Sequence, residues 1–218
     1  MIVEVCVDSL ESAIQAVRDG ADRLEFCSRL DVGGLSPCIE LYQAVRASVS
    51  LPLAVMIRLR PGHFCLTDSD TKQLCEVMEE FRNDPPSAFV FGATLPSGGL
   101  DYPRMEQLRE ACGPVTAVCH RAFDTMPDHR LALNYLIDLG FGRVLTSGGP
   151  GNVPDHLPAL TELVRQAGQR ITVMPGGGIR LPHLADVART GCTELHGSFT
   201  GVLPQVCQLL DGIALASG

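Results

Sequence analysis

Eight apolar runs alternate along the chain with segments of helical periodicity, and this alternation limits the possible folds most strongly. The runs predict strands at residues 2–7, 23–27, 53–58, 87–91, 115–120, 143–146, 171–174 and 194–196. Because strands separated by helices pair in parallel, the sequence predicts an α/β fold. Eight such units favour a (β/α)8 TIM barrel, which we expect to form a single domain over residues 1–218. An open doubly wound sheet is the alternative, but the first strand lacks the glycine-rich turn of a dinucleotide site.

The predicted helices carry recognisable start and stop signals. They span residues 9–19, 36–47, 67–82, 102–111, 128–139, 153–167, 181–189 and 203–215. Ser9 or Asp8 is expected to cap the first, Ser36 followed by Pro37 the second, and Thr67 or Asp68 the third. Glycine follows several of these helices, as is typical of helix C-termini.

Charge and composition exclude several classes of function. The formal net charge of −8 argues against binding to nucleic acid or to an anionic membrane surface. No apolar run approaches the ~18 residues of a membrane-spanning helix, and residues 1–4 lack the basic region of a signal peptide. We therefore expect a cytoplasmic protein. The single lysine, Lys72, lies in a helical segment, which disfavours a Schiff-base or phosphate-loop lysine.

The nine cysteines are expected to be reduced thiols. Their number is odd and the chain is long, so a disulfide scaffold is not indicated. No Cys-x-x-Cys pair occurs, which disfavours a structural zinc site. Most of these cysteines should be small buried apolar residues.

Strand alternation predicts an unusually polar barrel interior. If the valines of residues 2–7 and their counterparts in the next strands face the helices, the alternate residues face inward. The predicted inward set is Glu4, Cys6, Glu25, Cys27, Arg58, His120 and His196. Buried carboxylates need partners or shifted pKa values, so these groups mark either a site or a structural charge network. In the structural interpretation, Arg58 and Arg121 neutralise Glu4 and Glu25.

These residues allow acid–base chemistry on an anion at the C-terminal face of the barrel. Glu25, His120 and Asp124 can act as general acids or bases, and His196 belongs to the same ring of residues. Arg58 and Arg121 can bind an anion or stabilise developing negative charge.

Two glycine turns could supply backbone amides for a phosphate group. One is Ser147-Gly148-Gly149 and the other is Gly176-Gly177-Gly178, which follow the sixth and seventh predicted strands. The second position is the usual one in barrels. The alternative is that both are tight strand-to-helix turns.

Two thiols on adjacent strands could bind a soft ion such as Cu(I). Cys6 and Cys27 are the candidates, with histidines nearby. The alternative is that both are plain core thiols.

The sequence resembles the CutC copper-homeostasis family over about residues 2 to 198. The matching segments are residues 4–9 (EVCVDS), 20–27 (GADRLEFC), 55–58 (VMIR), 120–124 (HRAFD), 143–149 (RVLTSGG) and 173–178 (VMPGGG). The resemblance implies a cytoplasmic (β/α)8 barrel that handles copper and is usually oligomeric, here a dimer or tetramer. It also implies that Cys6 and Cys27 are Cu(I) ligands.

The chain departs from the family pattern at three places. His63 stands where the family tends to have an acidic residue, and Cys119 stands where it has Phe. Residues 198–200 read Ser-Phe-Thr instead of Ser-Ala-Arg, so an arginine that could contact an anion is missing.

Three functions therefore remain open from the sequence. The first is a Cu(I)-binding copper-homeostasis protein that uses Cys6 and Cys27. The second is a barrel enzyme acting on a small anionic, phosphorylated or sugar-like substrate. The third is a non-catalytic scaffold whose barrel supports oligomerisation.

Overall fold

The structure is a computed structural model that describes residues 1–216, and it is a (β/α)8 barrel as the sequence predicts. The strands are β1 (Ile2–Val7), β2 (Arg23–Phe26), β3 (Leu53–Met56), β4 (Ala88–Phe91), β5 (Thr116–Cys119), β6 (Arg143–Thr146), β7 (Thr172–Pro175) and β8 (Glu194–Gly197). All pair in parallel, in the order β7-β6-β5-β4-β3-β2-β1-β8. A parallel bridge between Gly176 and His196 closes the ring between β7 and β8.

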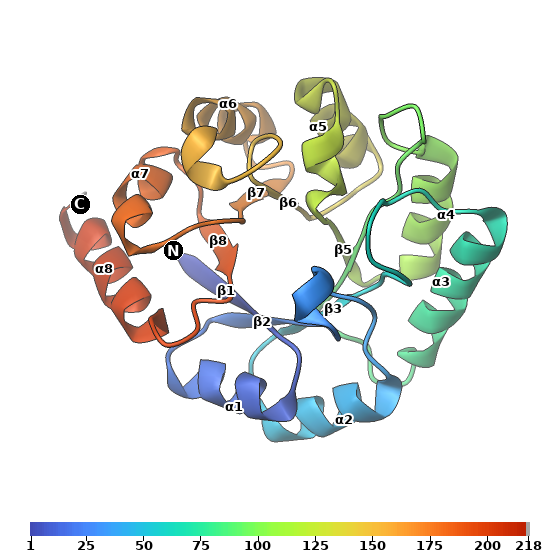
Figure 1. Cartoon of the computed structure of the whole chain (residues 1–218), viewed down its shortest axis with the longest axis horizontal. Helices are drawn as coiled ribbons and strands as arrows, with labels where there is room; N and C mark the ends of the chain where they lie inside the picture. The colour runs from blue at the N-terminus through green and yellow to red at the C-terminus, as the bar shows by residue number, and fades with distance from the viewer. Residues whose placement is uncertain (217–218) are drawn as a thin grey trace.

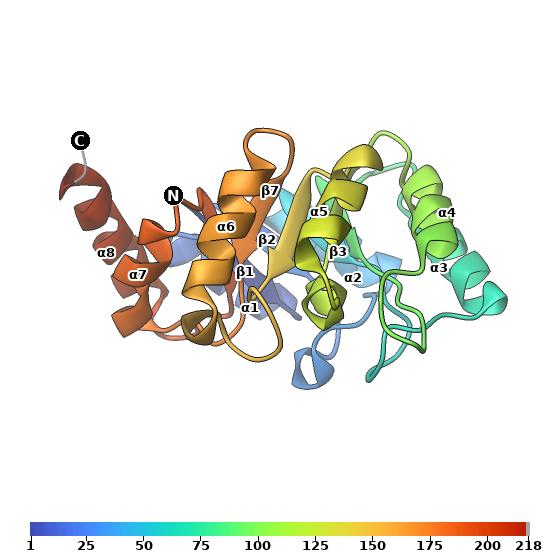
Figure 2. The ribbon, with the colours of Figure 1, turned by 90° about the horizontal axis from the view of Figure 1, so that it is seen from above.

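Eight α-helices surround the strands (Figures 1 and 2). They are α1 (Leu10–Arg18), α2 (Ile39–Ser48), α3 (Asp68–Glu80), α4 (Tyr102–Cys112), α5 (His129–Asp138), α6 (Leu157–Ala167), α7 (Leu184–Arg189) and α8 (Leu203–Ala216). Four short 3-10 helices lie in the loops: η1 (Leu30–Val32), η2 (Arg121–Thr125), η3 (Val153–Asp155) and η4 (Leu181–His183). Among the helices of residues 1–216, none combines the length and apolar character needed to cross a bilayer.

The caps explain where several helices begin. Ser9 caps α1 and Thr67 caps α3, each through a reciprocal capping box with the residue three positions later. The predicted cap of α2 at Ser36 is wrong, since α2 begins at Ile39. The Ser36 hydroxyl instead accepts a hydrogen bond from the backbone N–H of Arg58 at 2.8 Å, which ties the β2–α2 loop to the end of β3.

Two predicted helices are divided in the structure. The segment expected as one helix over 153–167 forms η3 and then α6, and the segment over 181–189 forms η4 and then α7. Each of these short 3-10 turns carries a proline at its start, namely Pro154 and Pro182. Proline fits the first turn of a helix but not its interior, so Pro158, which lies in the interior of the predicted 153–167 helix, explains why α6 begins anew at Leu157.

Apolar packing occurs in two separate places. The larger core lies between the strands and the helices and contains the outward-facing valines of β1. A smaller cluster fills one half of the barrel interior with Cys27, Ala54, Met56, Ala88, Val90 and Val118. The remaining half of the interior is polar, and this half holds the candidate site.

Candidate functional site

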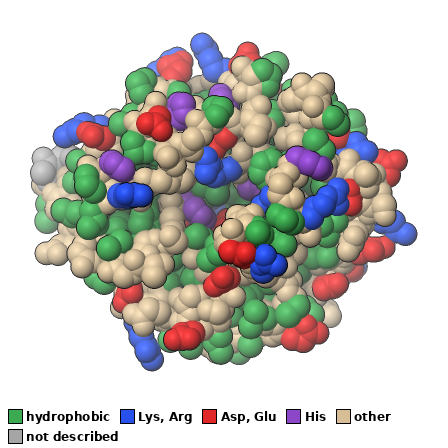
Figure 3. Space-filling model, in the orientation of Figure 1, with side chains coloured by type: hydrophobic (Ala, Val, Ile, Leu, Met, Phe, Trp, Pro, Cys, Tyr) green, Lys and Arg blue, Asp and Glu red, His purple; other side chains and the backbone are tan. Residues whose placement is uncertain are grey.

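A cavity of about 860 Å³ opens at the C-terminal ends of the strands. This volume is within the range of small-molecule sites. Figure 3 shows a hollow at the centre of this face, with histidine and basic side chains around it. Five of the seven residues predicted to point inward line the cavity: Cys6, Glu25, Arg58, His120 and His196.

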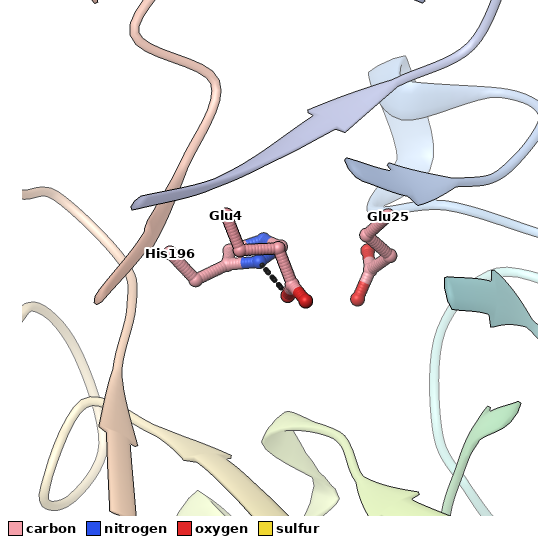
Figure 4. A group of neighbouring side chains, drawn as sticks. All are labelled: Glu4, Glu25 and His196. Carbon is pink, nitrogen blue, oxygen red and sulfur yellow. Dashed lines mark hydrogen bonds and ion pairs between the residues drawn. The ribbon is translucent and has the colours of Figure 1, made fainter. Parts of the chain in front are cut away.

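Three ionisable side chains from adjacent strands meet beside the floor of this cavity. Glu4, Glu25 and His196 come from β1, β2 and β8, and they point toward one another (Figure 4). One potential ligand atom from each lies within 4.8 Å of the others. His196 Nδ1 is 2.8 Å from Glu4 Oε1. The parallel register explains the meeting, since Glu4 is the direct partner of His196 in the ladder.

A buried charge network lies beneath this cluster, and its arginines are not those predicted. Arg23 forms two ion pairs of 2.5 Å, from its Nε to Glu4 Oε2 and from its Nη2 to Glu194 Oε2. Arg143 Nε lies 3.0 Å from the same oxygen of Glu194. The proposed neutralisation of Glu4 and Glu25 by Arg58 and Arg121 is therefore wrong. The alternation that places Glu25 inward also places Arg23 inward, two residues earlier, so the sequence contained the signal for this residue.

The cluster shifts the pKa values of its members in opposite directions. Burial opposes charge on Glu4, but the hydrogen bond and charge of His196, together with Arg23, lower its pKa to about 2. Burial likewise opposes charge on His196, yet Glu25, Cys6 and Glu4 raise its pKa well above the ordinary value. Burial raises the pKa of Glu25 to about 7. Glu25 is 3% exposed, and its Oε2 has no hydrogen-bond partner among residues 1–216.

Two thiols lie close to this cluster, since Cys6 is the ladder partner of Glu25 and Cys27 follows Glu25 by two residues. Cys6 is half-buried and lines the cavity, whereas Cys27 is fully buried in the apolar cluster with Met56. Gly34, in the loop after η1, covers Cys27: a Cβ on Gly34 would lie 3.3 Å from Cys27 Sγ and 3.5 Å from Met56 Cε. Burial, with the nearby charges of Glu25 and Cys6, raises the pKa of Cys27 far above its usual range. Cys27 is thus a protonated thiol that the loop shields from the cavity.

The opposite wall of the cavity is formed by His120 and Arg58. His120 is buried, and the centroid of its ring lies 4.6 Å from the centroid of the Phe64 ring. Its Nδ1 accepts a hydrogen bond from the backbone N–H of Ala122, and burial followed by the charge of Arg58 lowers its pKa to about 3. Neutral His120 therefore carries its ring proton on Nε2.

Arg58 has no carboxylate partner among the described residues. Its guanidinium donates hydrogen bonds to the backbone carbonyls of Gly33, Gly34 and Gly62. It also lies over the Phe64 ring, with Cζ 4.9 Å from the ring centroid. Its buried Nε has no acceptor within residues 1–216. The side chain therefore keeps an uncompensated positive charge at the cavity wall, as the anion-binding prediction requires.

Asp124 and Arg121, expected as an acid–base group and an anion-binding group, are instead bound to each other. Asp124 accepts a 2.8 Å hydrogen bond from Arg121 Nε and further bonds from Thr146 and from the backbone and hydroxyl of Ser147. It is 4% exposed and holds η2 against the end of β6. Asp124 is fully engaged in structural contacts. Arg121 gives it one hydrogen bond, donates further to Ser147 and to the Gly151 carbonyl, and still lines the cavity.

The two glycine turns differ in their access to the cavity. Ser147, Gly148 and Gly149 lie outside it, and the amides of Ser147 and Gly148 are bonded to Asp124 and Thr146. These two amides are therefore not free to bind a ligand. In the second turn Gly177 and Gly178 line the cavity, while the amide of Gly176 donates to the Thr146 carbonyl.

The departures from the family pattern lie in different environments. Ser198, Phe199 and Thr200 line the cavity, and Phe199 has a φ of 46°. The substitution of Thr200 for arginine thus changes the cavity wall itself. His63 is exposed and Cys119 is buried, and neither lines the cavity.

Comparison with known proteins gives a consistent match. The family model described as the CutC family matches residues 1–201. The human copper homeostasis protein cutC homolog is 41% identical over 198 residues, which cover 90% of this chain and 72% of the human protein. A CutC family protein from Caulobacter vibrioides is 40% identical over 205 residues, or 94% of this chain and 83% of that protein.

Solved structures agree with this match. The structure of CutC from Streptococcus agalactiae superposes with a TM-score of 0.86 and 27% identity, and the match covers 91% of this chain and 98% of the other. Thiamine phosphate pyrophosphorylase from Pyrococcus furiosus superposes with a TM-score of 0.64 at 15% identity, over 97% and 96% of the two chains. At that identity the likeness concerns the fold alone.

Proposed function

Because this chain belongs to the CutC family, we propose that it acts in copper homeostasis by binding Cu(I) through the thiols of Cys6 and Cys27. Relatives that are about 40% identical are named copper homeostasis proteins. Copper is here the cargo of the protein, and the cavity at the barrel mouth is its proposed route of entry.

The sulfur atoms at the cavity floor carry this proposal. Cu(I) is a soft ion that prefers thiolate and thioether ligands. Cys6 lines the cavity, Cys27 follows the last residue of the neighbouring strand β2, and the Met56 thioether packs in the same cluster as Cys27. Cu(I) would meet Cys6 first and then Cys27 beneath Gly34. Binding must displace the Cys27 proton, because only the deprotonated thiol is a strong ligand.

Cu(I) competition against a chromophoric chelator tests the proposal on reduced protein without oxygen. The Cys6→Ala, Cys27→Ala double variant is expected to lose the tight site. The matched control is the Cys38→Ala, Cys75→Ala double variant, which removes two thiols outside the barrel interior and should bind Cu(I) as the wild type does. Wild-type affinity in the Cys6 and Cys27 variant would exclude these thiols as the ligands.

The alternative, a barrel enzyme acting on a small anionic substrate, has narrower support. Arg58 and the Gly177-Gly178 turn still favour it, but Asp124, Arg121 and the Ser147 turn are engaged in structural contacts. The cytoplasmic location and the homo-oligomeric state remain predictions. Sedimentation equilibrium of the purified chain tests the second.

A further inference from the structure

The proposed function leaves the carboxylates and the imidazole of the cavity floor unexplained. Glu4, Glu25 and His196 converge there from three adjacent strands (Figure 4). All three are at most 8% exposed. Buried carboxylates are retained in proteins when they are paired or coordinate a metal.

Glu4 and His196 are paired with each other, and Glu4 also contacts Arg23. Glu25 is different, because it forms no ion pair among residues 1–216 and its buried Oε2 lacks a partner there. Leaving a buried polar atom unsatisfied costs about 1–3 kcal/mol, and more when it is charged. An unpartnered carboxylate oxygen that faces two other donors is therefore an independent sign that a ligand is missing from this cluster.

The charges of the interior point to a cation as that ligand. Three buried carboxylates, Glu4, Glu25 and Glu194, face two guanidinium groups, Arg23 and Arg143. Glu25 is the one of these three carboxylates that neither guanidinium contacts. A divalent cation bound by Glu25, Glu4 and His196 would give Glu25 a positive partner, with release of the proton that His196 Nδ1 shares with Glu4.

The distances suit a small divalent ion. Zinc binds imidazole and carboxylate at about 2.0–2.2 Å, so two ligand atoms of a tetrahedral site lie about 3.4 Å apart. His196 Nδ1 and Glu4 Oε1 are 2.8 Å apart, the distance of a hydrogen bond, and a bound ion would separate them slightly. The three potential ligand atoms lie within 4.8 Å of one another, so a side-chain adjustment of Glu25 completes the set. His196 and Glu25 also line the cavity, which leaves an open position for water or substrate.

We infer that Glu4, Glu25 and His196 form a binding site for a divalent cation of the zinc type, which uses other ligand atoms than the thiols proposed for Cu(I), although Cys6 lies beside Glu25 in the ladder. Oxygen and imidazole ligands suit zinc and manganese, whereas Cu(I) prefers sulfur. Three protein ligands with an open fourth position are the arrangement of catalytic zinc sites. The inference does not depend on copper binding, and either site can be present without the other.

Zn²⁺ titration of the reduced, metal-free protein against a zinc indicator tests the site. The wild type is expected to bind one equivalent. Glu25→Gln and His196→Gln should each weaken binding at least about tenfold, as expected for loss of a metal ligand. Glu80→Gln, on the exposed face of α3, and Cys38→Ala are the matched controls and should bind as the wild type does. Circular dichroism establishes that each variant is folded.

Co²⁺ spectroscopy of the wild type gives a second measurement that needs no substitution at the site. Nitrogen and oxygen ligation is expected, with no thiolate-to-cobalt charge-transfer band. Undiminished Zn²⁺ affinity in Glu25→Gln would overturn the inference, as would a charge-transfer band that disappears in Cys6→Ser. Cu(I) affinity of the Cys6 and Cys27 double variant is measured separately, so failure of one site is distinguishable from failure of the other.

Discussion

At the scale of single residues, His120 illustrates how burial fixes a protonation state. Its ring is enclosed by Phe64, by the backbone at Gly92 and by Ala122, and the charged group that faces it is Arg58. A Cβ at position 92 would lie 2.8 Å from His120 Cε1, so only glycine fits beside the ring. Neutral His120 can donate from Nε2 over the pH range in which most proteins work.

This burial predicts a loss of stability in acid. The pKa of His120 is about 3 in the folded protein and about 6.5 when unfolded, so the unfolded chain binds a proton that the native state refuses. His120 should therefore decrease the free energy of unfolding by about 2–3 kcal/mol between pH 7 and pH 4.5. Urea unfolding at a series of pH values measures the slope.

The matched substitutions separate His120 from other titrating groups. His120→Gln should flatten the slope in this window by the stated amount. His63→Gln, which changes an exposed histidine, should leave the slope unchanged. Equal slopes in the His120→Gln variant and the wild type would show that the buried ring is not the source.

At the scale of elements, the loop carrying η1 controls access to Cys27. The loop is fixed by bonds from the Arg58 guanidinium to the carbonyls of Gly33 and Gly34, and by a backbone pair between Ser28 and Leu35. Gly34 has a φ of 84° and lies directly over Cys27. The loop therefore separates the buried thiol from the cavity that Cys6 reaches.

Gly34→Ala is expected to destabilise the protein for two separable reasons. A non-glycine residue in the left-handed region costs about 1–2 kcal/mol. Contact of the new Cβ with Cys27 adds about 1 kcal/mol more, as in an overpacked core. Urea denaturation of Gly34→Ala measures the total.

Gly98→Ala is the matched control. Its φ is 87°, but a Cβ there meets nothing within 4 Å, so it carries the backbone penalty alone. Measured against the Cys27→Ala background, the cost of Gly34→Ala should decrease, but it should stay above that of Gly98→Ala because the Cβ of residue 27, also 3.3 Å from the new Cβ, remains. An unchanged cost would assign the effect to the loop backbone instead of the contact with the Cys27 thiol.

At the scale of the whole molecule, the barrel is divided into an apolar and a polar half. The polar half contains the chain of contacts from Glu4 through Arg23 and Glu194 to Arg143, which connects β1, β2, β8 and β6 across the interior. Of these strands, β8 takes part in the closure of the ring with β7, and β6 and β1 are the neighbours of that pair. The network thus stabilises the closed barrel and supports the cluster above it.

Arg23→Leu should be among the most destabilising single substitutions. It leaves Glu4 and Glu194 buried without Arg23, and breaking a buried pair in this way costs about 3–5 kcal/mol. Arg29→Leu, which removes an exposed pair with Asp31, should cost much less. Chemical denaturation of both variants measures the difference, and similar losses would contradict a central role for Arg23.

The sequence by itself determined the fold, because periodicity is a local property. Each apolar run and each capped helix is encoded within a few residues, and eight such units in order favour the barrel. Alternation along the strands likewise indicated that Glu4, Glu25 and His196 face inward. The same alternation would have located Arg23.

Only the tertiary structure decided which of these groups meet. Ion-pair partners depend on the stagger of strands around the barrel, so Glu4 is paired with Arg23 instead of Arg58. Asp124 is enclosed by Ser147 and Arg121 because η2 packs against the end of β6. Cys27 is shielded because Gly34 lies over it. These contacts join residues far apart in the chain, and local patterns contain no information on the distances between them.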